Sequence, residues 1–403
     1  MDTFWIILLF LVVLGGGIAT IAIVRRQRYI KALEAQGWTF ENSPTLDATF
    51  GLNCPPFGVG YNRSIDDLIA GTTAQGIPFR VFQYGSQGHV AVLTLPRPLP
   101  ELYIAAQPRA DAVGQQKTFG VWTVTATDPA WAEAAVGAIG ASVDAMAGGQ
   151  PVDLSVDGNH LVAVGAPREA VELRAFLEAL APVAQALAGP ALAQFTGPNP
   201  PAELSLYGYP QWIYRPRDDR FLDQVVSTGG GQNHAAEDVV LGEYYGIRMI
   251  ALTHTWQTTR TETSTDANGN TTTRTVTDNH SEALLEFHLP WPFGDMSVNW
   301  SGWGDRVRFE SADFNSAFTV RSPTPKFAYD VFHPRQMEFL LRAQPTSFAI
   351  ESSRVRFAVQ DVNPEVLTWR AQFLVAFLAG VPSFVWEDLG HPEPPISRDL
   401  DGF

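Results

Sequence analysis

The chain has 403 residues, 45 % of them hydrophobic and 17 % charged, and a formal net charge of −15. This length and apolar content allow two or three domains with sizeable cores. Four of the 27 basic side chains and one of the 42 acidic ones precede residue 32, so residues 32–403 carry a net charge of −18. Because such a charge repels phosphate backbones, we expect no nucleic-acid partner.

The N-terminal residues form an uncharged apolar run from Phe4 to Val24. A helix rises about 1.5 Å per residue, so this run is long enough to span a hydrocarbon core of roughly 30 Å. A cleaved signal peptide carries basic residues before its apolar core, whereas here they follow it. The sequence therefore predicts an uncleaved single transmembrane helix in residues 1–31. A buried core helix is the alternative.

Basic side chains directly follow the apolar run: Arg25, Arg26, Arg28 and Lys31. Lys and Arg beside a membrane span stay on the cytoplasmic side. We therefore expect a cell-membrane protein with its N-terminus outside and its globular domains in the cytoplasm. The same four residues are expected to contact anionic lipid headgroups, each contributing about 1 kcal/mol.

Two segments of the chain, 32–188 and 205–388, share short sequence matches in the same order. The matched pairs are Trp38–Phe40 with Trp212–Tyr214, Asn62–Gly71 with Asn233–Gly242, Leu95–Leu99 with Leu289–Phe293, Trp122–Val124 with Phe318–Val320, Asp128–Ala132 with Thr324–Ala328, Gln150-Pro151 with Gln344-Pro345, and Leu161–Val164 with Arg356–Val359. Seven matches at slowly drifting offsets predict two copies of one unit. The Pro/Gly-rich segment 189–204 is expected to link the copies.

Each copy is expected to open with an aromatic strand, followed by a short acidic helical turn that ends at Gly71 or Gly242. Later strands are predicted from alternating apolar residues. They are Ile77–Phe82, Val90–Leu95 and Val121–Thr125 in the first copy, and Ile247–Leu252, Ala283–Leu289 and Phe318–Val320 in the second.

Helix and hairpin signals complete each copy. Asp128 and Thr324 are interpreted as helix N-caps, since a proline follows each at the first helical position. A hairpin is expected next, turning at Asp157-Gly158 in the first copy and lying in Phe348–Val359 in the second. Apolar helices at Pro167–Ala181 and Pro364–Leu378 close the copies. This order predicts an α+β fold in which helices cover one face of each antiparallel sheet.

The second copy carries an insertion from Thr255 to His280 that the first copy lacks. It is threonine-rich, and Asn268-Gly269 near its middle is a strong hairpin signal. Both of its faces are polar, so we expect a long exposed hairpin, with a flexible loop as the alternative. Because exposed strand edges can bind another strand, we expect a protein partner here. The acidic, Pro-rich segment 389–403 is expected to be a disordered tail.

The second copy resembles the bacterial family called domain of unknown function 3137 over residues 205–385. The residues that carry the resemblance are Glu237–Gly246, Phe314, Phe318 and Val320, Ala328-Tyr329, His333–Leu341, Phe348–Ile350 and Val355–Val359. The resemblance implies a membrane-associated bacterial protein without an assigned activity. It lends no catalytic residue. The first copy departs further from the pattern, with Ala147-Gly-Gly149 in place of a Leu-rich helix end.

No motif in the sequence indicates a particular chemistry, so we expect no catalytic, cofactor-binding or metal-binding residues and no cofactor. Cys54 stands alone in a loop and excludes an intrachain disulfide. His254 and His288 lie on adjacent predicted strands and could face each other, but surface histidines are the simpler interpretation. Gly229–Gly231 lacks the Lys and Ser/Thr of a phosphate-binding loop and is interpreted as a turn.

Two acidic pairs, Asp66-Asp67 and Glu237-Asp238, recur at one repeat position. They could serve a hydrolase, although acids before an apolar run are more often helix caps. Trp291, Trp300 and Trp303 could stack on sugar rings, although aromatic residues on strands more often belong to a core. We therefore expect a non-enzymatic membrane-anchored scaffold or interaction module. The alternatives are an envelope hydrolase and an outward-facing carbohydrate-binding protein.

Overall fold

The computed structural model describes residues 24–61, 63–147, 153–265, 271–301 and 304–396. The chain divides into two compact units. Unit 1 contains Met1–Val59 and Arg63–Tyr207, and unit 2 contains Gly60–Asn62 and Gly208–Phe403. Apart from Val24, the predicted transmembrane span lies outside the described residues, as do Asn268-Gly269 and residues 397–403.

Among the helices in the described part of the chain, none combines the length and apolar character needed to cross a membrane.

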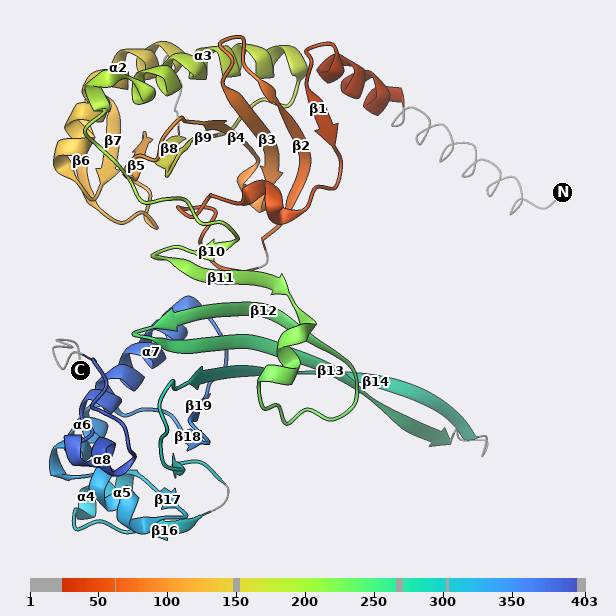
Figure 1. The fold of residues 1–403 in the computed structure, drawn as a ribbon. Helices are drawn as coiled ribbons and strands as arrows, with labels where there is room; N and C mark the ends of the chain where they lie inside the picture. Colours follow the sequence, from red (N-terminus) through yellow and green to blue (C-terminus); the bar gives the residue numbers. More distant parts are fainter. Residues whose placement is uncertain (1–23, 62, 148–152, 266–270, 302–303, 397–403) are drawn as a thin grey trace. The chain divides into compact units, whose positions relative to one another are not determined.

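Unit 1 contains an antiparallel sheet in the order β1-β2-β3-β4-β9-β8-β5-β7-β6, with helices α2 and α3 on one face (Figure 1). The strands are β1 (Thr39–Glu41), β2 (Ile65–Thr72), β3 (Pro78–Tyr84), β4 (His89–Thr94), β5 (Leu102–Ala105), β6 (Gln115–Phe119), β7 (Trp122–Ala126), β8 (Asp153–Asp157) and β9 (His160–Val164), and the helices are α2 (Pro129–Ala147) and α3 (Ala170–Ala188). The main core lies between the helices and the sheet. A helix over residues 24–34 precedes β1.

In unit 2 the strands β11 to β19 follow the order β11-β12-β13-β14-β19-β18-β15-β17-β16. They are β11 (Tyr209–Arg217), β12 (Gln232–Tyr244), β13 (Ile247–Thr265), β14 (Thr271–His288), β15 (Met296–Val298), β16 (Asp305–Val307), β17 (Val320–Ser322), β18 (Phe348–Glu351) and β19 (Arg354–Ala358). The helices are α4 (Ala312–Ala317), α5 (Pro325–Val331), α6 (Pro334–Ala343), α7 (Pro364–Ala379) and α8 (Ser383–Asp388). The predicted α+β class with antiparallel sheets is confirmed.

Adding ten to every strand number of unit 1 reproduces the strand order of unit 2. The closing helices α3 and α7 also follow equivalent hairpins, β8–β9 and β18–β19. Each sheet has a second, smaller apolar cluster on its other face. In unit 1 this cluster includes Leu52 and Phe57 from the loop after β1, and in unit 2 it includes Phe221 from the 3-10 helix Asp219–Gln224.

The predicted acidic helical turns are wrong, because these residues lie in strands β2 and β12. Each strand has a bulge at the matched position, where Asp67 has φ 53° and Asp238 has φ 48°. Aspartate tolerates this left-handed conformation better than most residues. The acids therefore mark a bulge in a strand, a feature that resembles a helix cap when only the local sequence is read.

Residues 189–204, predicted as a linker, lie along unit 1. Leu192 is buried, the Arg97 guanidinium donates to the carbonyl of Phe195 at 2.6 Å, and the Gly197 N–H donates to the carbonyl of Pro98 at 3.2 Å. The short strand β10 (Ser205–Leu206) follows this segment.

In both units a tryptophan packs on a glycine of the second strand; Trp38 directly precedes β1, and Trp212 lies in β11. A Cβ atom at Gly71 would lie 2.6 Å from Cδ1 of Trp38, and one at Gly242 would lie 2.6 Å from Cδ1 of Trp212. Both tryptophans are buried. Glycine is therefore required at these two positions to leave room for the indole ring.

We expect Gly71→Ala and Gly242→Ala each to lower the free energy of unfolding of their unit by about 1–3 kcal/mol, because the added methyl group overpacks the site. Urea-dependent hydrogen exchange of peptides from each unit measures this change. The control is Gly137→Ala in the exposed face of α2, where an added Cβ meets nothing within 4 Å. That substitution should raise stability by roughly 0.5–1 kcal/mol. Equal effects at all three glycines would contradict the tryptophan–glycine assignment.

Candidate functional site

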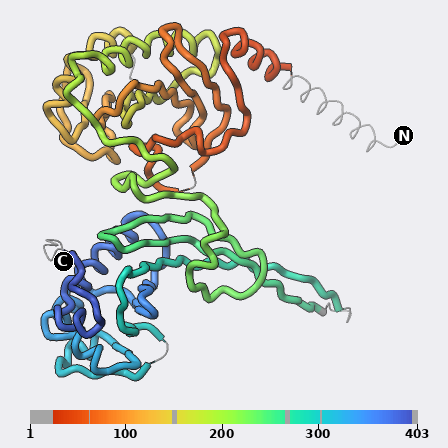
Figure 2. Tube along the Cα trace, in the orientation of Figure 1, coloured from red at the N-terminus to blue at the C-terminus, as the bar shows by residue number. Residues whose placement is uncertain are grey.

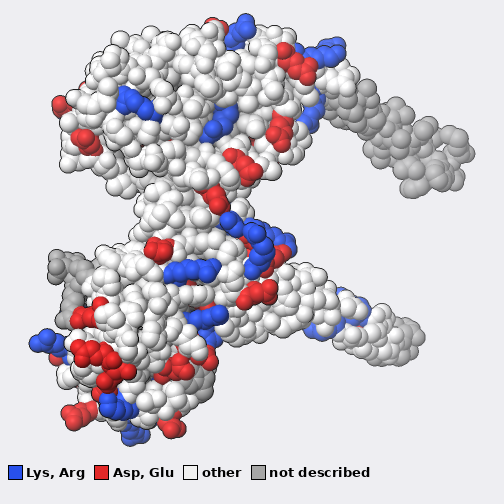
Figure 3. All heavy atoms as spheres, in the orientation of Figure 1, with Lys and Arg blue, Asp and Glu red and all other residues white. Residues whose placement is uncertain are grey.

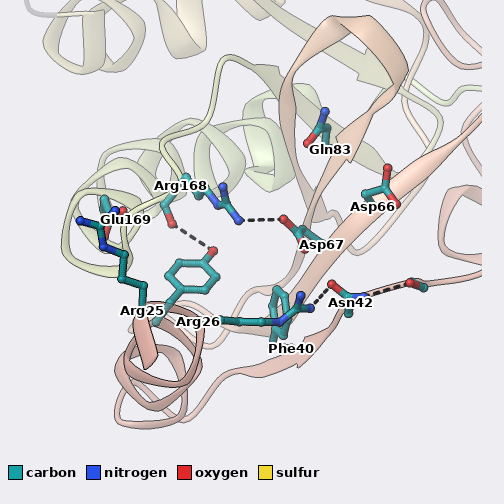
Figure 4. A pocket seen from close by; sticks show the side chains of 11 residues that line it. Arg25, Arg26, Phe40, Asn42, Asp66, Asp67, Gln83, Arg168 and Glu169 are labelled. Atoms are coloured by element: carbon teal, nitrogen blue, oxygen red, sulfur yellow. Dashed lines mark hydrogen bonds and ion pairs between the residues drawn. The ribbon is translucent and has the colours of Figure 1, made fainter. Parts of the chain in front are cut away.

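A cavity of about 760 Å³ lies in unit 1 beside the helix of residues 24–34 (Figure 4). It is lined from four parts of the unit. Arg25, Arg26 and Tyr29 come from the helix, Phe40, Asn42 and Ser43 from β1 and the segment after it, Asp66, Asp67 and Gln83 from β2 and β3, and Arg168 and Glu169 from the start of α3. Two of the predicted headgroup-binding residues and one predicted acidic pair thus share one cavity.

The helix of residues 24–34 is attached to unit 1 by its apolar stripe. Leu33 is fully buried in the main core, and the Tyr29 ring packs edge-on against Phe40 with a centroid distance of 5.7 Å. The Tyr29 hydroxyl donates to the carbonyl of Arg168 at 3.2 Å. Tyr29 and Leu33 are four residues apart, so this side of the helix could have been found from the sequence. These contacts fix where Arg25 and Arg26 enter the cavity.

The cavity contains both positive and negative groups. Arg26 donates to the side-chain oxygen of Asn42 and lies over the Phe40 ring, whereas Arg168 pairs with Asp67 at 3.1 Å and points toward it in Figure 4. Among the described residues, Arg25 has no ion-pair partner. The lining thus carries three guanidinium groups together with the carboxylates of Asp66, Asp67 and Glu169. The arrangement suits binding of a polar charged group.

The two predicted acidic pairs lie in different units and have structural partners. Asp67 pairs with Arg168, and the Asp238 carboxylate accepts a hydrogen bond from the Tyr214 hydroxyl at 2.8 Å. In each pair the two acids are neighbours in one strand. Two-carboxylate hydrolysis requires acids on opposite sides of the scissile bond. The geometry therefore gives the hydrolase alternative no support.

His254 and His288, which the sequence left able to face each other, do not do so, because the β13–β14 register pairs His254 with Glu282 and His288 with Arg248. The preferred interpretation as surface histidines is wrong for His254, which is buried. The buried His254 donates from Nδ1 to the Glu282 carboxylate at 3.0 Å. Its Nε2 lies 2.8 Å from Nδ1 of His234, on β12. Because an ionised carboxylate only accepts, Nδ1 of His254 is the donor to Glu282, and Nε2 of His254 shares one hydrogen with Nδ1 of His234.

Glu282 collects several hydrogen bonds at the base of the insertion. Its carboxylate accepts from the Thr228 N–H at 3.0 Å, from the Thr228 hydroxyl at 2.7 Å and from the Gly229 N–H at 3.3 Å. Burial raises the pKa of this carboxyl, but the hydrogen bonds from His254, Thr228 and Gly229 outweigh burial and lower it. Gly229 belongs to the predicted turn, and a Cβ there would lie 2.7 Å from Cε1 of His254.

Four aromatic rings stack in sequence above this network. His234 stacks on His254, His254 on Trp256, and Trp256 on His280, with centroid distances of 5.1, 4.8 and 5.4 Å. Among the described residues, no group of three or more His, Cys, Asp or Glu side chains is arranged to hold a metal ion. Sequence reasoning missed this stack, because it depends on the register of three strands.

The tryptophans of unit 2 lie in different surroundings. Trp291 packs edge-on against Trp386, and Trp303 lies outside the described residues. Trp300 has the Arg356 guanidinium 5.5 Å from its ring centroid and lines a cavity of about 550 Å³ beside β14 and β19. The structure thus does not gather Trp291 and Trp300 into one aromatic platform for a sugar.

Cys54 lies in a buried polar cluster of unit 1. The Asp157 carboxylate accepts from the N–H groups of Asn53 and Cys54, both at 2.8 Å. Burial raises the pKa of the Cys54 thiol well above its usual value, with a further contribution from Asp157. A protonated, buried thiol is a poor nucleophile. Cys54 therefore serves as a core residue.

A comparison with solved structures finds a likeness to the mycobacterial trehalose monomycolate transport factor A, TtfA, with 15 % sequence identity and a TM-score of 0.33. The match covers 43 % of this chain and 97 % of that one. A likeness this weak carries no argument about fold or function. No family model matches the chain, and no curated protein matches it.

We expect Asp157 and His160 to make opposite contributions to stability between about pH 4 and 6.5. Burial raises the pKa of Asp157 to about 6, and burial together with Arg80 lowers the pKa of His160 to about 4. Folded Asp157 binds more protons than the unfolded chain, so its contribution falls as pH rises. Folded His160 binds fewer, so its contribution rises with pH. Each change is about 3 kcal/mol.

Replacing one of the two residues should therefore expose the pH dependence of stability that the other contributes. Asp157→Asn should make unit 1 more stable as the pH rises from 4 to 6.5, and His160→Gln should make it less stable, relative to the native chain. The measurement is urea unfolding at each pH, read by pulsed hydrogen exchange of β8 and β9 at one fixed labelling pH. Parallel profiles for both variants and the native chain would refute the assignment.

Proposed function

We propose that this chain is a single-pass membrane-anchored protein that acts as a non-enzymatic scaffold or interaction module. The observation that carries the proposal is the ribbon formed by β13 and β14, defined here as residues 258–265 and 272–283. Figure 2 shows it extending away from the rest of unit 2. A projecting two-stranded ribbon adds little to a core, so its length is better explained by contact with a partner.

The ribbon has two exposed strand edges. β12 pairs with β13 up to Gln257, and β19 pairs with β14 from Leu284 onward. Beyond these points the two strands pair with each other in an unbroken register. An isolated two-stranded hairpin is marginally stable, and exposed edges readily accept another strand. A partner strand would satisfy the backbone groups on either edge.

Side chains link the strands at the base of the ribbon and further out along it. Asn233 donates to Gln257 at 2.7 Å, and Gln257 donates to Asn279 at 2.9 Å, which links β12, β13 and β14 by their amides. Further out, Arg260 pairs with Asp278 at 2.8 Å. The ribbon is therefore held as a preformed surface, which reduces the entropy lost when a partner binds.

The membrane anchor in this proposal is the apolar run Phe4–Val24, with the N-terminus outside and both units in the cytoplasm. The attachment of helix 24–34 to unit 1 supports a second element, the contact of Arg25 and Arg26 with anionic headgroups. In the view of Figure 3 basic and acidic side chains are interspersed over both units. Since neither unit shows a broad basic face in this view, contact with anionic lipid would come from the few basic residues beside the anchor.

We also propose that the two units are copies of one ancestral unit. The shared strand order, the bulges at Asp67 and Asp238, and the tryptophan–glycine contacts support a duplication. The resemblance of residues 205–385 to the domain of unknown function 3137 family stays a prediction. In this proposal the insertion in unit 2 added an interaction surface to one copy only.

Labelling of a single cysteine in the ribbon tests the proposed topology. We replace Cys54 with Ser, which can make the same hydrogen bonds in the core, and introduce Ser264→Cys at an exposed position. A membrane-impermeant maleimide should label this thiol only after the cells are lysed. Labelling of intact cells would place the ribbon outside and would favour an envelope partner instead.

A further inference from the structure

The outer edge of β14 is the longest free strand edge of the ribbon. It runs from Thr272 to Ala283, a length of about 40 Å at the usual rise of a strand. Its ladder with β13 shows no register shift, and β14 contains no proline. Natural edge strands usually carry such interruptions, because an uninterrupted edge can pair with another chain. The backbone of this edge is therefore open to pairing along its whole length.

We propose that the partner of this edge is the β14 edge of a second copy of the chain, paired antiparallel about a twofold axis at Val276. The inference deepens the proposed function and rests on it, since it names the partner of the ribbon. A twofold axis at Val276 places Arg274 opposite Asp278 of the second copy, and repeats the same pair on the other side. The edge is thus complementary to itself, as an isologous interface requires.

The charges of the strand select this register. Within one chain Glu262 lies opposite Arg274 and pairs with it at 2.6 Å. In the proposed register Asp278 of the second copy lies on the other side of Arg274. Arg274 would then stand between two carboxylates, Glu262 of its own chain and Asp278 of the second copy. An axis at Arg274 would instead bring two arginines together, and one at Asp278 two aspartates. Like charges directly opposite each other destabilise a strand pair.

The other face of the ribbon fits the same register. Thr259 lies opposite Thr277, and Thr261 opposite Thr275, within one chain. The axis at Val276 places Thr275 against Thr277 of the second copy, so the threonine rows would continue across all four strands. Moving the axis to Thr275 or Thr277 would keep threonines against threonines on this face, but it would separate Arg274 from Asp278 of the second copy. The threonine face is therefore compatible with the axis at Val276, and the two Arg274–Asp278 pairs select it.

Disulfide trapping in the full-length, membrane-embedded chain tests the proposal. In the Cys54→Ser background, Val276→Cys places two thiols at the axis and should give a covalent dimer on mild oxidation with copper phenanthroline. Thr275→Cys and Thr277→Cys are the matched controls. Each alone should crosslink at least tenfold less, whereas membranes containing equal amounts of both variants should give about half the dimer yield of Val276→Cys, because half of randomly formed dimers contain one copy of each variant.

Three outcomes would overturn the proposal. One is an accessible Val276→Cys thiol that forms no dimer, and another is equal crosslinking by all three single-cysteine variants. The third is a crosslink from position 276 to a different protein. That result would support the ribbon as a contact surface but would refute the proposal that its partner is a second copy of the chain. A non-covalent check uses Val276→Lys, which should shift the native dimer to a monomer in light scattering, while Thr263→Lys should not.

Discussion

The antiparallel ladder between β13 and β14 is the interaction on which unit 2 depends. At one end its residues Leu285 and Phe287 are buried among the apolar side chains of unit 2, and at the other end the same register continues into solvent. Because a strand ladder transmits its register along its whole length, the apolar core fixes which residues face which along the ribbon. The equivalent pair in unit 1, β3 and β4, stops where its sheet ends.

Features that depend on neighbouring residues were predictable from the sequence. The turn at Asp157-Gly158 and the helix starts at Pro129 and Pro364 carry their signals within three or four residues. The hairpin β8–β9, the start of α2 and both ends of α7 were therefore predicted close to their observed positions. The α+β class followed from their order. Neighbouring residues determine where these elements begin and turn, and the tertiary contacts are compatible with those positions.

Features that depend on distant residues were not predictable. The Tyr29 hydroxyl meets a carbonyl 139 residues away, and His254 meets Glu282 only because of the strand register. The acids at Asp67 and Asp238 were misread for a related reason. Their local sequence resembles a helix cap, but the strands on both sides supply backbone partners that make a bulge the better solution. The candidate cavity likewise needed four separate segments to be brought together.

The attachment of helix 24–34 to unit 1 fixes the direction in which each of its side chains points around the helix axis. Tyr29 and Leu33 fasten the helix, and Arg25 and Arg26 reach the cavity from the preceding turn. One inserted residue between Arg26 and Tyr29 would rotate the two arginines by about 100° around the helix axis. The cavity would lose both cations while the docked turn stayed in place. The number of residues in this turn, as much as their identity, sets the charge of the cavity.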